Sequence, residues 1–355
     1  MLNPELKLNQ KIFEADVEFK SMRAALGEAL VKAGEIDGQV VALSAALSES
    51  TGLLPFKNKF PERYIEVGVA EQNLVTVASG LAAMGKIPFA ASYAIFSPGR
   101  NWEQIRTTIC YNNVPVKLIG THAGVNVGAD GGSHQALEDI ALMRVLPKMV
   151  VLSPCDYFET IKAVLAVART KDPTYIRLPR EKSPVITSEE TPFEIGKARI
   201  FYQLAGFDKE TFNPYPHIQI RKPDMKTAKD KISVGIIATG PLLYLALKAA
   251  EKLETKGRQV IVMNISTIKP LDEEALIHLA RKTGALVTVE EHQVAGGLGS
   301  AVSECVVAHF PVPIEFVAVK DKFGQSGQAD ELITHYDLGE KDICLAAERV
   351  LLRKN

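Results

Sequence analysis

An acid stands where a strand-like segment passes into a helix in VGVAEQN. Glu71 follows the strand pattern YIEV and lies in the first turn of an apolar, small-residue helix that runs towards Gly85. The helix dipole stabilises a negative charge at this end, which is one sufficient explanation. A carboxylate among Val69, Ala70 and Leu74 is also partly desolvated, and such an acid suits proton exchange with a heterocycle.

Aromatic side chains follow the next apolar strand, in FAASYAIFSPGR. Tyr93 and Phe96 are three residues apart near the strand end, and Arg100 comes just beyond them. A core aromatic pair explains this spacing. The alternative is a flat slot in which a ring stacks between the two aromatics.

A glycine-rich loop, GTHAGVNVGADGGSHQALED, carries His122, Asp130 and His134. Its glycines allow the backbone to approach a ligand closely, and the carboxyl ends of strands are where doubly wound sheets bind ligands. Without a compact HxH or HxxxH pair, the loop does not favour zinc. Histidines that hydrogen-bond a polyol and transfer protons fit better, although loop histidines without a function are the alternative.

Basic residues leave the strand TYIRL in the segment IRLPREK. Arg177, Arg180 and Lys182 lie near one edge of the sheet. A guanidinium there could bind a phosphate bidentately. The alternative is that the segment is a solvated basic turn. The segment AGGLGS lacks the spacing of a dinucleotide loop and reads as a glycine turn that opens a helix.

Strand and helix patterns alternate along the chain and must position these residues. They indicate an α/β fold with two doubly wound, mostly parallel sheets. The predicted strands are VVALS, YIEV, IPFAAS, VPVKLIG, MVVLS and TYIRL in the first block, and ISVGIIATG, QVIVMNIS, ALVTVEE and IEFVAV in the second. We expect domains at 1–187 and 232–355, joined by a linker at 188–231 in which 201–230 forms a hairpin or an insertion.

The bulk composition limits the function classes. The chain has 355 residues with 46% hydrophobic content and a net charge of −1, which favours two globular domains and gives no sign of nucleic-acid or membrane binding. The N-terminus has no apolar signal core. Four cysteines lie far apart without a CxxC pair, which argues against a zinc site or disulfides and fits a reduced cytoplasm.

Together, these stretches resemble the C-terminal two-thirds of transketolase, and more closely the separate C-terminal subunit of a split transketolase. GVAEQN, SYAIFSPGR, GADGGSHQ and IRLPREK carry the resemblance, together with STIKPLD and VEEHQVAGGLGS later in the chain. The resemblance covers nearly the whole chain. It implies a pyrimidine-binding domain followed by a transketolase C-terminal domain, with thiamine diphosphate as the cofactor.

The resemblance also implies roles for the cofactor-binding residues. Glu71 would face N1′ of the aminopyrimidine, where a carboxylate stabilises the tautomer that takes up a proton. Tyr93 and Phe96 match aromatic positions that hold the ring, and Arg100 falls near a further family position, although SPGR is one residue longer than the family pattern. Ala46 stands where the family commonly has an acid.

Substrate contacts follow from the same resemblance. His122, Asp130 and His134 match residues that contact sugar hydroxyls, and the two histidines join Glu71 as predicted catalytic residues. Arg180 matches an arginine that binds the sugar phosphate, and Ser50 falls where a phosphate-contacting serine lies. The implied reaction moves a two-carbon ketol unit from a ketose phosphate to an aldose phosphate in the cytoplasmic pentose phosphate pathway.

No GDG motif occurs in this sequence, although the family uses one to hold the diphosphate through Mg²⁺ or Ca²⁺. We therefore expect an N-terminal partner subunit that carries this motif and the metal, self-association of this chain in an α2β2 heterotetramer, and no activity of the chain alone.

Three alternatives remain open from the sequence. The β subunit of a 2-oxoacid dehydrogenase has the same two-domain layout, and 1-deoxyxylulose-5-phosphate synthase shares the GVAEQ pattern. The histidines of GADGGSHQ and Arg180 favour sugar phosphates over 2-oxoacids, and the synthase is normally one long chain. The third alternative is a non-catalytic scaffold with this fold.

Overall fold

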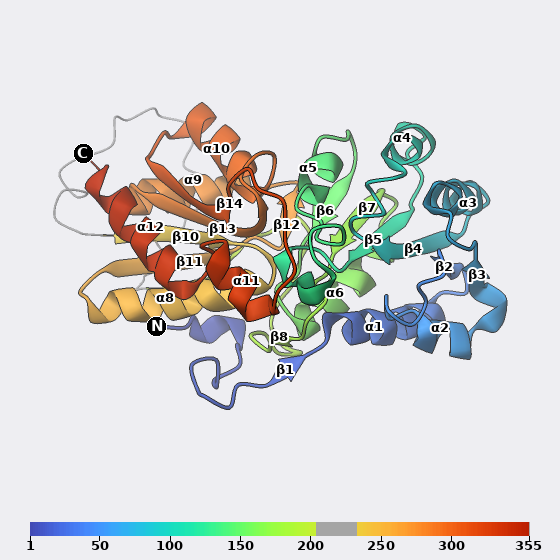
Figure 1. The fold of residues 1–355 in the computed structure, drawn as a ribbon, viewed down its shortest axis with the longest axis horizontal. Coiled ribbons are helices and arrows are strands. Elements are labelled where there is room, and N and C mark those ends of the chain that lie inside the picture. Colours follow the sequence, from blue (N-terminus) through green and yellow to red (C-terminus); the bar gives the residue numbers. More distant parts are fainter. Residues whose placement is uncertain (204–232, 355) are drawn as a thin grey trace.

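The computed structural model describes residues 1–203 and 233–354 of the chain. Figure 1 shows two α/β halves side by side, the first running from blue to green and the second from yellow to red. Each half consists of a sheet with helices on both faces, as the alternating patterns predict. None of the helices in these described ranges is long and apolar enough to cross a membrane.

The first sheet has seven strands in the order β12-β6-β7-β5-β4-β2-β3. All of its strands except β12 run parallel to their neighbours, whereas β12 pairs with β6 in the antiparallel direction. Its strands are β2 (Val40–Ser44), β3 (Tyr64–Glu66), β4 (Ile87–Tyr93), β5 (Lys117–Thr121), β6 (Val150–Leu152), β7 (Thr174–Arg177) and β12 (Thr267–Lys269).

Helices cover both faces of this sheet because its central strands are apolar on both sides. Within β2, Ala42 packs with one helix layer and Leu43 with the other. The first layer comprises α1 (Met22–Ile36), α2 (Leu54–Lys59) and α6 (Tyr157–Val167). The second comprises α3 (Glu71–Ala83), the short α4 (Trp102–Gln104) with the π-helical segment Ile105–Tyr111 that continues it, and α5 (Asp139–Arg144).

The second sheet has five strands in the order β14-β13-β10-β11-β9, and only β9 is antiparallel to its neighbour. They are β9 (Arg199–Tyr202), β10 (Ser233–Ala238), β11 (Gln259–Asn264), β13 (Leu286–Gln293) and β14 (Ile314–Val319). The helices of this half are α8 (Leu243–Thr255), α9 (Glu273–Thr283), α10 (Leu298–His309), α11 (Ala329–His335) and α12 (Glu340–Leu352). A two-stranded ribbon joins β1 (Phe19–Lys20) to β8 (Ser183–Pro184).

The two halves exchange segments, which the strand patterns do not predict. β12 comes from the second half of the chain but extends the first sheet. Leu6, Leu8 and Ile12 lie near the N-terminus but pack into the core of the second half. The predicted domain limits stay a prediction, and most of the 201–230 segment lies outside the described residues.

A buried ion pair fixes the contact between the halves. The Arg177 Nε lies 2.9 Å from Oδ2 of Asp139, and Tyr175 donates its hydroxyl hydrogen bond to the same oxygen at 2.8 Å. The Arg177 Nη2 donates to the backbone oxygen of Glu291 at 2.6 Å, across the junction. Arg177 is therefore a structural residue rather than part of a solvated basic turn.

The replacement Asp139→Asn leaves the Arg177 guanidinium buried without its counter-charge. We expect the free energy of unfolding to fall by about 3–5 kcal/mol, measured by urea denaturation followed by circular dichroism. The replacement Glu194→Gln is the matched control, because the exposed Glu194 and the half-buried Arg199 form a pair 3.8 Å apart that should contribute less than about 1 kcal/mol. Equal losses in the two variants would contradict the structural role of Asp139.

Candidate functional site

Glu71 begins α3 and is buried, with only 5% of its surface exposed. The preceding loop reaches this position through Gly68, whose φ of 72° is readily adopted only by glycine. Asn101 donates from Nδ2 to the backbone oxygen of Glu71 at 2.8 Å. The Asn101 Oδ1 is buried and has no hydrogen-bond partner among the described residues. A desolvated acid and an unsatisfied amide oxygen therefore lie together.

Arg100 compensates the charge of Glu71. Its Nη1 lies 3.1 and 3.2 Å from the two carboxylate oxygens, and its guanidinium carbon lies 4.1 Å from the centre of the Phe96 ring. The Arg100 side chain is 51% exposed, so it can move without disturbing the core. A ring that docked on Phe96 beside Glu71 would replace this guanidinium.

Tyr93 lies in a stack of rings. Its ring centre is 5.7 Å from that of Phe96 and 3.8 Å from that of His122. A third ring needs about 7 Å between the two aromatics, since each stacked contact takes about 3.5 Å. The slot between Tyr93 and Phe96, one of the two alternatives from the sequence, is therefore absent from this structure, and a stacking surface remains on the side of Phe96 that Arg100 covers.

His122 follows β5 directly and is buried. Its φ is 57°, an uncommon backbone conformation for a residue with a side chain, and such strain concentrates at functional sites. Burial lowers the pKa of His122 to about 3, with further lowering by Arg23 and Arg180 and a smaller contribution from His134. The imidazole is therefore neutral at neutral pH.

His134 completes the cluster, whereas Asp130 does not join it. The His134 ring meets Phe96 edge-on with 5.5 Å between ring centres, and Tyr93 at 6.3 Å. Asp130 is exposed at the end of the short helical segment Val125–Asp130, and its side chain forms no hydrogen bond or ion pair with the described residues.

Two arginines, Arg23 and Arg180, lie beside His122, and Ser50 lies next to them. Arg23 donates to the backbone oxygens of Ser50, at 2.6 Å, and of Arg180, at 2.9 Å. Its Nε is buried and has no partner in the described part of the chain. Arg23 is not among the residues predicted from the sequence, although a cation in the first turn of a helix opposes the helix dipole and is a signal of another function.

The second half of the chain holds in place the glycine-rich loop that carries His122 and His134, here called the histidine loop. Glu291 accepts hydrogen bonds from the backbone and side-chain nitrogens of Asn126 at 2.6 and 3.0 Å. Gln135 donates to the backbone oxygen of Gln325 at 2.9 Å. A Cβ at Gly124 would lie 2.3 Å from a carboxylate oxygen of Glu291, so only glycine fits there.

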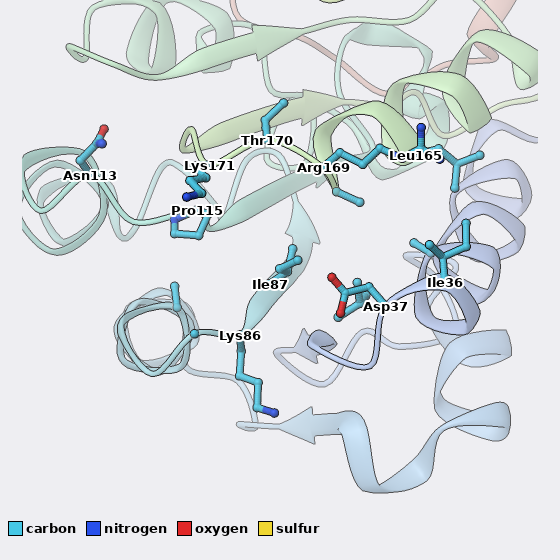
Figure 2. A pocket seen from close by; sticks show the side chains of 15 residues that line it. Ile36, Asp37, Lys86, Ile87, Asn113, Pro115, Leu165, Arg169, Thr170 and Lys171 are labelled. Atoms are coloured by element: carbon cyan, nitrogen blue, oxygen red, sulfur yellow. The ribbon is translucent and has the colours of Figure 1, made fainter.

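A separate hollow of about 490 Å³ lies at the opposite, amino-terminal edge of the first sheet. Figure 2 shows its lining, with Ile36, Asp37, Lys86 and Ile87 on one side and Thr170 across the hollow from them. None of the predicted site residues lines it. Apart from Asp130, the predicted cofactor and substrate residues instead lie beyond the carboxyl ends of the parallel strands, as expected for a doubly wound sheet.

Comparison with known proteins places this arrangement in a family. Residues 19–185 match the transketolase pyrimidine-binding domain, and residues 224–343 match the transketolase C-terminal domain. A putative transketolase C-terminal section from Methanocaldococcus jannaschii is 39% identical over 336 residues, covering 94% of this chain and 96% of that protein. This chain belongs to the transketolase family. Its two α/β halves are thus the pyrimidine-binding and C-terminal domains of a transketolase, and the fold prediction is confirmed.

Other transketolase relatives also have the length of this chain. A 6-deoxy-6-sulfo-D-fructose transketolase subunit from a Clostridium species is 37% identical and covers 97% of this chain and 98% of that subunit. A solved split-gene transketolase, described as an inactive beta4 tetramer, superposes with a TM-score of 0.81 at 40% identity, covering 94% of this chain and 99% of that chain. The predicted resemblance to a split transketolase subunit is confirmed.

The environment of His122 predicts its titration. Because burial and two arginines lower its pKa to about 3, its ring should stay neutral from pH 5 to pH 9. Histidine-labelled protein followed by NMR should show no titration of the resonance that disappears in His122→Gln. A midpoint near 6.5, the usual histidine value, would contradict this environment.

Proposed function

We propose that this chain holds the aminopyrimidine of thiamine diphosphate in a two-subunit transketolase that transfers a two-carbon ketol unit from a ketose phosphate to an aldose phosphate. The observation that carries the proposal is the buried carboxylate of Glu71 beside Phe96, in one cluster with His122 and His134. The sequence offers no GDG motif for the diphosphate, so the chain supplies one half of the site.

The residues around the start of α3 fit an aminopyrimidine. The Phe96 face supports a flat ring, the Glu71 carboxylate can hold a proton at N1′, and the unsatisfied Asn101 Oδ1 offers an additional acceptor near Glu71. When bound, thiamine diphosphate supplies a thiazolium carbon that can act as a nucleophile. Tyr93 supports Phe96 and His122 from within the ring stack, and Arg100 moves away from Glu71 to admit the ring.

Arg23 and Arg180 suit a sugar phosphate. Arg23 is half-buried and its Nε has no partner among the described residues, so an anion there would satisfy it. The neutral imidazole of His122 orients substrate hydroxyls by hydrogen bonding, since a group with a pKa of about 3 is a weak base. His134 faces the same space, and Ser50 lies next to the arginines. In this proposal Asp130 reaches the sugar only when a substrate orders the loop end.

An N-terminal partner subunit supplies the diphosphate and metal site in this proposal, with Mg²⁺ or Ca²⁺ as the ion. The related split-gene chain described as an inactive beta4 tetramer supports both self-association and dependence on a partner. An α2β2 assembly follows if each active site forms between unlike chains. All four cysteines are free, which is consistent with a cytoplasmic enzyme of sugar-phosphate metabolism.

Two related activities are the alternatives. A synthase of deoxyxylulose phosphate shares the pyrimidine-site acid, but relatives that match this chain from end to end carry transketolase names. A 2-oxoacid dehydrogenase subunit shares the layout, but its substrate gives no reason for the arginines beside His122. Product analysis with a ketose phosphate donor distinguishes the three.

The chain alone should show no ketol transfer, even with thiamine diphosphate and Mg²⁺ present. Mixing it with a separately purified transketolase subunit that carries the GDG motif should restore transfer, measured by coupled detection of the released aldose phosphate. The reason is that neither chain holds the whole cofactor. Robust transfer by the chain alone would overturn the half-site proposal.

The replacement Glu71→Gln tests the proton partner in the assembled complex. We expect a loss of activity of about 10²-fold or more with assembly unchanged by size-exclusion chromatography. The replacement Glu103→Gln is the matched control, because Glu103 is also an acid in the first turn of a helix but is exposed. If the chain were a non-catalytic scaffold, neither replacement would change the activity of the complex.

The replacement Arg180→Met should raise KM for phosphorylated substrates by about 10- to 100-fold while changing KM for the unphosphorylated sugars much less, because a charged hydrogen bond to phosphate is lost. Lys182→Met provides the control, since Lys182 is an exposed cation in the same segment. Equal effects on the two substrate classes would exclude phosphate binding by Arg180.

A further inference from the structure

A second cluster of chemically active side chains lies in the C-terminal domain, on elements that do not carry the site described above. Glu273, Cys305 and His309 each place one potential metal-ligand atom within 4.8 Å of the others. We propose that these three side chains bind a divalent transition-metal ion of the zinc type. These residues form no CxxC pair, and Glu273 lies on a different helix from Cys305 and His309, so the sequence pattern does not indicate the site.

Helix geometry explains why these side chains meet. Cys305 and His309 are four residues apart on α10, so they lie on the same face of that helix. Glu273 is the first residue of α9, which packs against α10 in the domain core. The three line a groove of about 800 Å³ together with Arg144 and Glu304.

Burial and charge in this groove favour an ion. Cys305 is buried, whereas Glu273 and His309 are exposed, so an ion could enter from solvent and reach the sulfur. No lysine or arginine of the described residues forms an ion pair with Glu273. Its negative charge is therefore available to a cation.

The orientation of His309 is also suitable. Its Nδ1 lies 2.9 Å from the backbone oxygen of Cys305. In the tautomer that donates this hydrogen bond, the lone pair stands on Nε2. Metal-binding histidines commonly have their other ring nitrogen fixed in this way by a carbonyl oxygen.

Donor chemistry selects the class of ion. A thiolate, an imidazole and a carboxylate match zinc and similar ions, and three protein ligands leave a fourth position for water. Ligand atoms around tetrahedral zinc lie about 3.3–3.8 Å apart, and the exposed side chains of Glu273 and His309 can adjust to that spacing. Burial raises the pKa of the Cys305 thiol to about 11, so the ion must displace its proton to solvent, which reduces the affinity.

Cobalt substitution tests the proposal directly. The untagged full-length chain is treated with a chelator, freed of it, and titrated with Co²⁺ alone. We expect a thiolate-to-cobalt charge-transfer band in the near ultraviolet that saturates at one ion per chain. Zinc added afterwards should remove the band. The absence of a band in the wild-type chain would overturn the proposal.

Matched variants assign the ligands. Cys305→Ser should abolish the band, whereas Cys344→Ser should keep it, because Cys344 is also a buried free thiol but lies on α12. His309→Ala and Glu273→Gln should each weaken Co²⁺ binding by at least about tenfold, as expected for the loss of a ligand. A band that survives Cys305→Ser, or that disappears equally in Cys344→Ser, would refute the assigned site.

Discussion

The geometry of the candidate site depends on the hydrogen bonds that the guanidinium of Arg177 donates. It is fully buried and binds the carboxylate of Asp139 on one side and the backbone oxygens of Ala136 and Glu291 on the other. These three groups belong to α5, to the end of the histidine loop and to the C-terminal domain. The Arg177 side chain at the end of β7 thus connects α5, the loop that carries the histidines, and the C-terminal domain.

This connection explains why the C-terminal domain belongs to the catalytic architecture although none of the predicted site residues lies in it. The carboxylate of Glu291 accepts a hydrogen bond from the backbone of Asn126 across the junction, and the backbone oxygen of Gln325 accepts one from the side chain of Gln135. Asn126 and Gln135 both lie in the glycine-rich loop that carries His122 and His134. The loop is rich in glycine and would otherwise be mobile, so the second domain provides the rigidity that its own sequence lacks.

Much of the fold could be predicted because buried parallel strands are short apolar runs with clear boundaries. VVALS, for example, corresponds to β2 without any shift. The swapped strand β12 and the edge strand β9 could not be predicted, since pairing with a distant partner leaves no local pattern. The same limit applies to the site. Residue types identified Glu71 and the two histidines, but the stacking of Tyr93 on His122 and the contribution of Arg23 depend on tertiary distances.

Charge compensation accounts for the state of the site in the separate chain. Glu71 is buried, and a buried carboxylate without a partner would be costly, so Arg100 provides the counter-charge and also covers Phe96. In the proposed function, an aminopyrimidine would supply what Arg100 gives up, namely a hydrogen bond to Glu71 and a flat group stacked on Phe96. Because Arg100 is half-exposed, its release restores its hydration and lowers the cost of this exchange. Arg100 thus compensates the buried charge of Glu71 in the separate chain, and in the proposed function the aminopyrimidine would replace it.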